Sequence, residues 1–483
     1  MPIRRAHITS SAAQSELTTA LADLRVALKI PADFPSDVLE EAQEAASGAD
    51  PMPDRVDLRA VPFCTIDPQG SKDLDQALHI ERTGTGFTLR YAIADVPSFV
   101  AAGGALDIES LRRGQTLYAP DARVPLYPTV LSEGAASLLP DEDRRALVWR
   151  FALDERAQVT DVALDRAMVR SVRQWSYVDA QAAVDARMAP ESLGLLAVIG
   201  PLRQQLERER GGASLDASDE EIIRTEHGYD IERRSPLPIE DWNAQVSLLT
   251  GMVAATVMLD GGVGILRTMP PAGEDMIAAF RRQTKALGIP WAEGVDYGEY
   301  LRSLDRDSPA ALAVMQAASG LFRGAGYLAF ARRPAEDPVQ AAIGAPYAHV
   351  TAPLRRLVDR FGLEICHALV AHEPVPAWAR DGLAALPSIM GSSSALAGRL
   401  DAGAIDRVEA AILSSRVGET FGAVVLTVGK GHARVQLLDP VVTATMDAGD
   451  APPGSSVRVR LASADIATGT VVLERAPQAT ASS

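Results

Sequence analysis

Three carboxylates lie close together in the stretch TIDPQGSKDLDQA, which covers positions 65–77. They belong to Asp67, Asp73 and Asp75. The last two are separated by one residue, so in extended backbone their side chains point to the same side. Converging carboxylates repel one another unless a cation lies between them, and hard oxygen ligands favour Mg²⁺ or Mn²⁺ over zinc. The stretch therefore predicts a divalent metal site; the alternative is a solvated acidic turn.

The surrounding residues predict how these carboxylates are positioned. Residues 63–66 form a short apolar run typical of a β-strand, which places Asp67 at the end of that strand. Pro68, Gly70 and Ser71 follow with the residue types that favour turns. We therefore expect the acidic site at the edge of a sheet, built from a strand end and its loop.

Longer stretches of the chain resemble the catalytic domain of the ribonuclease II/ribonuclease R (RNB) exoribonucleases. The resemblance begins with Asp57-Leu58-Arg59 and FCTIDPQGSKDLDQA, and continues through YAIADVPSF and LYAPDARVPLYP to LPDEDRRAL. A second strong motif is AHVTAPLRRLVDR at residues 348–360. The similarity covers residues 55–375, and a weaker match extends over the last part of the chain.

The resemblance implies a processive 3′→5′ exoribonuclease. Such an enzyme hydrolyses single-stranded RNA to nucleoside 5′-monophosphates by metal-ion catalysis, in RNA turnover. Two divalent ions, Mg²⁺ with Mn²⁺ as a substitute, would activate the attacking water and stabilise the leaving oxygen. By the same resemblance Asp67, Asp73 and Asp75 are metal ligands, and Asp73, Asp75 and Arg355 are catalytic.

Gln76 departs from the family pattern. The family normally has a fourth aspartate at this position, so D-L-D-Q stands here in place of D-x-D-D. An amide oxygen can bind a hard cation but lacks the carboxylate charge, and we keep Gln76 as a fourth predicted metal ligand. Its odd offset from Asp73 and Asp75 leaves open that it points away from the site. The alternative function is a catalytically impaired RNB-like protein that threads RNA 3′ ends without cutting them.

The resemblance also predicts residues that contact RNA. Tyr118, in LYAPDARVPLYP, is expected to stack on a base near the 3′ end, and stacking tolerates any sequence because every base has a π-face. Arg355 is expected to bind the phosphate through its planar fork, and Arg356 flanks it. Arg267 is a phosphate or structural contact. The alternatives are a half-buried loop aromatic and a surface arginine pair.

Composition limits the class of protein. The chain has 483 residues, 47% of them hydrophobic, which is enough for about three folded domains. Its net charge of −16 is unusual for a nucleic-acid binder, and we interpret it as an acidic exterior around an interior basic channel. The two cysteines, Cys64 and Cys366, do not have the spacing of a zinc site. The expected protein is a cytoplasmic monomer that binds single-stranded RNA and no membrane, since we find neither an apolar signal core nor a long uninterrupted apolar segment.

The predicted fold class is α+β, with a mixed sheet surrounded by helices as the RNB catalytic domain. A small helical domain precedes it and an OB-fold β-barrel of the ribosomal-protein type follows it. The predicted divisions are residues 1–54, 55–412, 413–478 and a disordered tail at 479–483.

The two terminal domains carry their own expectations. Apolar periodicity predicts helices at residues 13–28 and 36–46, which either form a helix-turn-helix-like unit or pack on the catalytic domain. Residues 376–412 are expected to be helix and linker. In the barrel, Lys430 and Arg434 are predicted to contact RNA phosphates.

Overall fold

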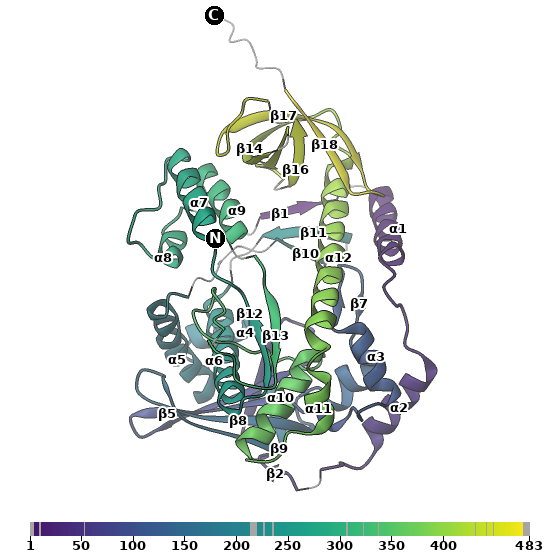
Figure 1. The fold of residues 1–483 in the computed structure, drawn as a ribbon. Helices are drawn as coiled ribbons and strands as arrows, with labels where there is room; N and C mark the ends of the chain where they lie inside the picture. The colour runs from purple at the N-terminus through teal and green to yellow at the C-terminus, as the bar shows by residue number, and fades with distance from the viewer. Residues whose placement is uncertain are drawn as a thin grey trace, which may run out of the picture.

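The computed structural model describes residues 4–8, 11–52, 54–212, 220–225, 228–233, 236–305, 308–321, 323–336, 338–429, 431–440, 442–447 and 449–476. Lys430 and the predicted tail at 479–483 lie outside these residues. A mixed sheet wrapped by helices occupies one end of the molecule, and a small β-barrel occupies the other (Figure 1). This arrangement confirms the predicted α+β class.

The large sheet positions the acidic stretch. Its order is β2-β9-β3-β4-β5-β8, and β8 also pairs with the first part of β9, so the pairings close into a ring. The strands are β2 (Val56–Asp57), β3 (Phe63–Asp67), β4 (Gln76–Thr83), β5 (Gly86–Ala94), β8 (Asp143–Leu153) and β9 (Val159–Ser176). Strand β3 is buried along its length until Asp67, as the apolar run predicts. Asp67 therefore ends one strand, and Asp75 immediately precedes the next.

Helices and a two-stranded ribbon cover this sheet. They are α3 (Ala105–Arg113), α4 (Tyr177–Asp185), α5 (Glu191–Glu209), α6 (Pro238–Gly261), β12 (Gly264–Thr268), β13 (Gly326–Phe330), α10 (Leu357–Val370) and α11 (Ala377–Gly382). Helix α6 is long and apolar enough to cross a membrane by length and composition alone. Half of its most apolar window is buried against its neighbours, as in the core helix of a folded domain.

The N-terminal segment does not form a helical unit of its own. Helix α1 (Ser11–Ala27) packs on α12 (Leu386–Ser414), and α2 (Ser36–Ser47) packs on α3. Their buried side chains belong to two different cores, so the helix-turn-helix alternative is wrong and packing on other parts of the chain is observed. The prediction also missed a strand, β1 (Arg4–His7), which pairs with β11 (Gly228–Arg233) beside β10 (Glu220–Thr225).

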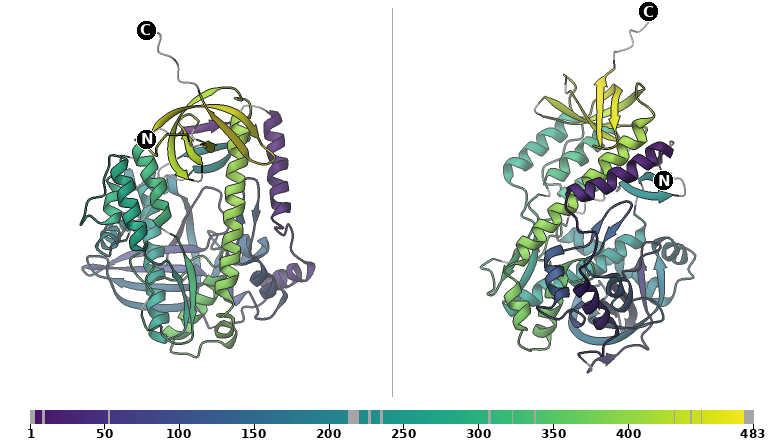
Figure 2. Two further views of the ribbon diagram at one scale, coloured as in Figure 1. Left: turned by 45° about the horizontal axis from the view of Figure 1, so that its top comes forward. Right: turned by 90° about the vertical axis from the view of Figure 1, so that its right-hand side faces the viewer.

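Helix α12 connects the two ends of the molecule. It runs without a break from the helical side of the sheet to the barrel, with α1 beside it in both views of Figure 2. The linker predicted within residues 376–412 is therefore wrong at GSSSALAG, which is helical. Serine and glycine are tolerated there because α12 is held by burial on several neighbours, which overrides their weak helix propensity.

The barrel and a helical arm complete the fold. The closed barrel has the order β14-β15-β16-β18-β17, the five-stranded arrangement expected of an OB-fold. Its strands are β14 (Thr420–Gly429), β15 (His432–Leu437), β16 (Thr443–Asp447), β17 (Ser456–Asp465) and β18 (Thr470–Arg475). The arm consists of α7 (Glu274–Ala286), α8 (Tyr297–Arg302) and α9 (Pro309–Ala318), and α9 packs against β14.

Candidate active site

Asp67 is the acidic residue whose charge the fold leaves unmatched. It ends β3, and its carboxylate has no hydrogen-bond or ion-pair partner among the described residues. Burial, followed by the neighbouring charge of Asp73, raises the pKa of Asp67 to about 7, although Arg355 acts in the opposite direction. A carboxylate that is half-buried, unpartnered and close to a second carboxylate is suited to binding a cation.

Asp73 lies beside an arginine and the predicted stacking aromatic. Arg123 Nη1 is 2.5 Å from Asp73 Oδ1, and the same guanidinium binds Glu133. Tyr118 donates its hydroxyl to Asp73 Oδ2 at 3.4 Å while its side chain stays 52% exposed. Both come from the short ribbon of β6 (Leu117–Tyr118) and β7 (Arg123–Val124). The ring of Tyr118 is therefore fixed at one end and open to a base.

Asp75 is bound by the loop that carries the second sequence motif. The Leu354 backbone N–H donates to Asp75 Oδ1 at 2.7 Å, and Arg355 Nε is 3.8 Å from Oδ2. Burial raises the pKa of Asp75 to about 8, against the lowering effects of Arg355 and the Leu354 N–H. The two motifs recognised in the sequence thus meet at Asp75.

Gln76 already has a protein partner at each end of its amide. Its Nε2 donates to the Thr351 carbonyl at 2.7 Å, and its Oε1 accepts from the buried Tyr91 hydroxyl. The metal-ligand role of Gln76 stays a prediction, and the hydrogen bonds favour the other orientation left open by its offset. In that orientation Gln76 ties β4 to the loop that carries Arg355.

The three predicted arginines have different environments. Arg355 is 43% exposed and is free to meet a phosphate. Arg356 instead binds Asp359 with two donors, Nε and Nη2, at 2.8 and 2.7 Å. These bonds hold the Arg356 guanidinium in a structural contact, and its RNA contact stays a prediction. Arg267 lies over the Tyr327 ring at 4.8 Å and donates to Gly326, which is the structural alternative for that residue.

The acidic residues suit a hard cation by their chemistry rather than by a ready-made cage. Within the described ranges, no group of three His, Cys, Asp or Glu side chains could hold a metal ion as it stands. Asp75 faces Leu354 and Asp73 faces Arg123, so only Asp67 has a free carboxylate. The oxygen-only donor set, and the repulsion between Asp67 and Asp73, still fit Mg²⁺ or Mn²⁺. Binding there would require Asp73 to be shared with or released by Arg123.

Sequence reasoning missed Arg123, Tyr91 and Glu133. Arg123 stands within the LYAPDARVPLYP motif that singled out Tyr118, so its place beside a stacking aromatic was a usable signal. Tyr91 lies on the buried β5 and nothing in its local sequence points to Gln76. In the barrel, Arg434 is exposed on β15 and its charge acts on Asp406 of α12; its RNA contact stays a prediction.

Comparison with known families follows these motifs along the chain. Residues 55–372 match the RNB domain family, and residues 419–476 match the RNase II-type exonuclease C-terminal S1 domain. Ribonuclease R of Vibrio cholerae is 25% identical over 360 residues, which are 68% of this chain and 42% of that protein. The chain spans about 35–44% of the length of the first curated relatives it matches.

Solved structures show the same fold. Mycoplasma genitalium RNase R in complex with ribose-methylated single-stranded RNA matches with a TM-score of 0.86 at 18% identity, covering 95% of this chain and 78% of that one. Yeast Ssd1, a pseudonuclease, matches with a TM-score of 0.67 at 14% identity, covering 97% of this chain and 59% of that one. At these identities the match establishes the shared fold.

Proposed function

Because the chain belongs to the RNB-domain family, we propose that it is a processive, metal-dependent 3′→5′ exoribonuclease that releases nucleoside 5′-monophosphates from single-stranded RNA. The observation that carries the proposal is the unpartnered carboxylate of Asp67, which lies close to Asp73 and to the exposed guanidinium of Arg355. The exposed ring of Tyr118 is held beside Asp73. We take the protein to act as a cytoplasmic monomer. Its two cysteines are buried and unpaired, which is compatible with a reducing compartment.

The acidic, basic and aromatic residues of the site would have different roles. Asp67, Asp73 and Asp75 would hold Mg²⁺ or Mn²⁺, which when bound supplies Lewis-acid activation of water and of the phosphate. Arg355 is close enough to Asp75 to bind the phosphate on which negative charge develops. Tyr118 positions the terminal base by stacking. Gln76 and the Leu354 N–H keep the Arg355 loop beside the acidic residues.

The second candidate function is an RNA-binding protein that does not cut. Gln76 in place of the family aspartate favours it, because the acidic site has one carboxylate fewer. The fold is shared with Ssd1, whose structure is described as that of a pseudonuclease. Both candidates predict binding of RNA 3′ ends, so only chemistry separates them.

The deciding experiment is a hydrolysis assay on uniformly labelled RNA with a single-stranded 3′ tail. We expect Mg²⁺ or Mn²⁺ to support release of nucleoside 5′-monophosphates, and EDTA to abolish it. An Asp75→Asn variant serves as the matched control for contaminating nuclease, since it keeps the shape of the side chain. Tight binding of the RNA with no mononucleotide released in either metal would establish the second candidate instead.

A further inference from the structure

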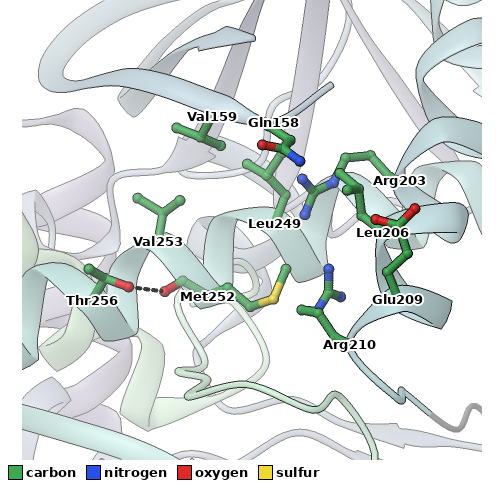
Figure 3. A pocket seen from close by; sticks show the side chains of 10 residues that line it. All are labelled: Gln158, Val159, Arg203, Leu206, Glu209, Arg210, Leu249, Met252, Val253 and Thr256. Atoms are coloured by element: carbon green, nitrogen blue, oxygen red, sulfur yellow. Dashed lines mark hydrogen bonds between the residues drawn. The ribbon is translucent and has the colours of Figure 1, made fainter. Parts of the chain in front are cut away.

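A cavity lies away from the acidic site, where α5, α6 and the turn between β8 and β9 meet (Figure 3). Its volume is about 440 Å³, within the range of small-molecule pockets. Helix α6 separates the two places. Asn243 and Ser247 of α6 contact Ile66 and Thr351 at the acidic site. Residues 249, 252, 253 and 256 line the cavity, and the helical repeat puts them on the opposite face of α6.

Arg203 brings an unneutralised charge to this cavity. Its side chain is buried, with 5% of the residue exposed, and Nη1 donates to the Ala157 carbonyl at 3.0 Å. The buried Nε–H has no partner, and no carboxylate of the described residues forms an ion pair with this guanidinium. Burial, together with the nearby charge of Arg210, lowers the pKa of Arg203 to about 10.

Arg210 repeats the pattern two turns further along. It donates through Nε to the Ile343 carbonyl at 3.5 Å, and its buried Nη2 has no partner among the described residues. In Figure 3 its guanidinium and that of Arg203 both point into the space beside Leu249 and Met252. Two cations thus face one cavity, Arg203 from within α5 and Arg210 from the residue that follows its last turn.

The nearby carboxylates are engaged elsewhere. Glu209 lines the cavity but its oxygens accept from Arg156 at 3.1 and 3.0 Å. Glu207 accepts from Gln245, and its charge offsets only part of the burial effect on the pKa of each arginine. Buried charges without a partner are costly, so the arrangement favours an anion that enters from solution.

The remaining wall defines the rest of the ligand. It is formed by Val159, Leu206, Leu249, Met252 and Val253, while Gln158 places an amide at one side. We propose that this cavity binds a small organic phosphate, with the phosphate between Arg203 and Arg210 and a planar or apolar body against α6. Guanidinium forks bind phosphate oxygens in pairs, which suits this head group. A nucleoside 5′-monophosphate has this chemistry, and choosing it rests on the proposed function because it is the product of that reaction.

The test is equilibrium binding of uridine 5′-monophosphate, uridine and inorganic phosphate, measured by calorimetry in EDTA. We expect the full chain to bind the monophosphate. Its affinity for uridine alone or for phosphate alone should be at least tenfold weaker. Arg210→Gln should lower the affinity for the monophosphate at least tenfold. Arg208→Gln is the matched control, because Arg208 is an exposed arginine in the last turn of α5 and contacts Gln205. Met252→Trp, which fills the cavity, should abolish binding without removing a charge.

The proposal is overturned if Arg210→Gln and Arg208→Gln bind the monophosphate equally well, or if nothing binds. If inorganic phosphate and the monophosphate bind with equal affinity, the proposed contact between the cavity wall and the organic part of the ligand is refuted. Crystals grown with the monophosphate that show it only beside Asp67 also overturn the cavity as its site. EDTA prevents hydrolysis, so these outcomes do not depend on exonuclease activity, and an inactive protein that binds would refute only the proposed function.

Discussion

Two aspartates flank neighbouring strands of the large sheet, and the fold treats them differently. Asp75 precedes β4 and Asp95 follows β5, and the Ala94 N–H donates to the Asp75 carbonyl at 2.9 Å. Asp95 is fully buried, and both of its carboxylate oxygens accept from Arg166 Nη1 at 2.7 Å. Arg55 Nη1 forms a second ion pair with Asp95 Oδ2 at 2.8 Å. Asp75 is 7% exposed. Its carboxylate accepts from the Leu354 backbone N–H and has one arginine, Arg355, at 3.8 Å.

We interpret the difference as that between a structural carboxylate and a candidate functional one. Arg166 also binds Glu364 at 2.5 Å, so the Asp95 cluster joins β5, β9 and α10 with its charges matched inside the protein. At the acidic site the charges of Asp67 and Asp75 are incompletely matched, and burial raises both pKa values. Carboxylates with perturbed pKa values concentrate at functional sites. The comparison therefore predicts that changes at the first cluster act on stability, and changes at the second act on chemistry.

The largest effect is expected for Asp75→Asn. It keeps the side-chain shape and removes one charge from a site that must hold a cation. We expect turnover on single-stranded RNA to fall at least a thousandfold, equivalent to about 4 kcal/mol in the barrier. RNA affinity, measured by fluorescence anisotropy in EDTA, should change less than threefold. Parallel loss of affinity and turnover would place Asp75 with Asp95 as a structural residue.

Asp95→Asn tests the structural half of the comparison, because it should affect stability and not turnover. It leaves Arg55 and Arg166 buried beside a neutral amide, and removing one partner of a buried pair costs about 3–5 kcal/mol. Urea denaturation should show this loss in the free energy of unfolding. The folded fraction should keep its turnover, because Asp95 contacts no group of the acidic site. A fully stable but inactive variant would contradict this division.

Tyr118→Ala tests the open face of the acidic site. Stacking of one base on an aromatic ring contributes about 1–3 kcal/mol, so RNA affinity should fall roughly five- to 150-fold. Tyr118→Phe is the control: it keeps the ring and removes only the hydroxyl contact with Asp73. Its affinity should match the parent protein. An equal loss in both variants would assign the effect to the hydroxyl.

The raised pKa values at the acidic site should make the stability of the metal-free protein depend on pH. A carboxyl whose pKa is raised on folding binds more protons when folded, so its contribution to stability falls as pH rises from about 4. For Asp67 that fall ends near its folded pKa of about 7. We expect thermal unfolding in EDTA to show lower stability at pH 8 than at pH 5, by on the order of 2 kcal/mol.

Two controls check the origin of that pH effect. Asp67→Asn should flatten the slope, because it removes one of the titrating groups. Mg²⁺ added at pH 8 should restore stability, because a cation favours the ionised carboxylates. A slope unchanged by Asp67→Asn would locate the titration elsewhere.

Gln76→Asp is expected to have the smallest effect. A carboxylate cannot donate to the Thr351 carbonyl, so stability should fall by about 1 kcal/mol. The metal concentration for half-maximal turnover should stay unchanged, since the side chain faces Tyr91 and Thr351. A clear decrease in that concentration would instead support Gln76 as a replaced ligand. Tyr91→Phe, which removes the other hydrogen bond, should cause a similar loss of stability.

The sequence by itself determined what is local. The apolar run ending at Asp67 and the turn residues after it follow from neighbouring residues, and the structure has both. The predicted OB-fold barrel at the C-terminal end is also observed. The motifs around Asp67, Tyr118 and Arg355 also predicted the family and which side chains gather. Periodicity and short-range spacing carry this information because strand and turn preferences act over a few residues.

Only the tertiary structure decided which partner each charged group takes. Leu354 lies 279 residues from Asp75, and Thr351 lies 275 residues from Gln76, so no local pattern links them. The same holds for α1, which reaches α12 rather than forming a unit with α2. Arg355 and Arg356 are adjacent in sequence, yet one guanidinium is open and the other is held by Asp359. Burial and long-range packing set these differences, because they depend on what the rest of the chain brings to each side chain.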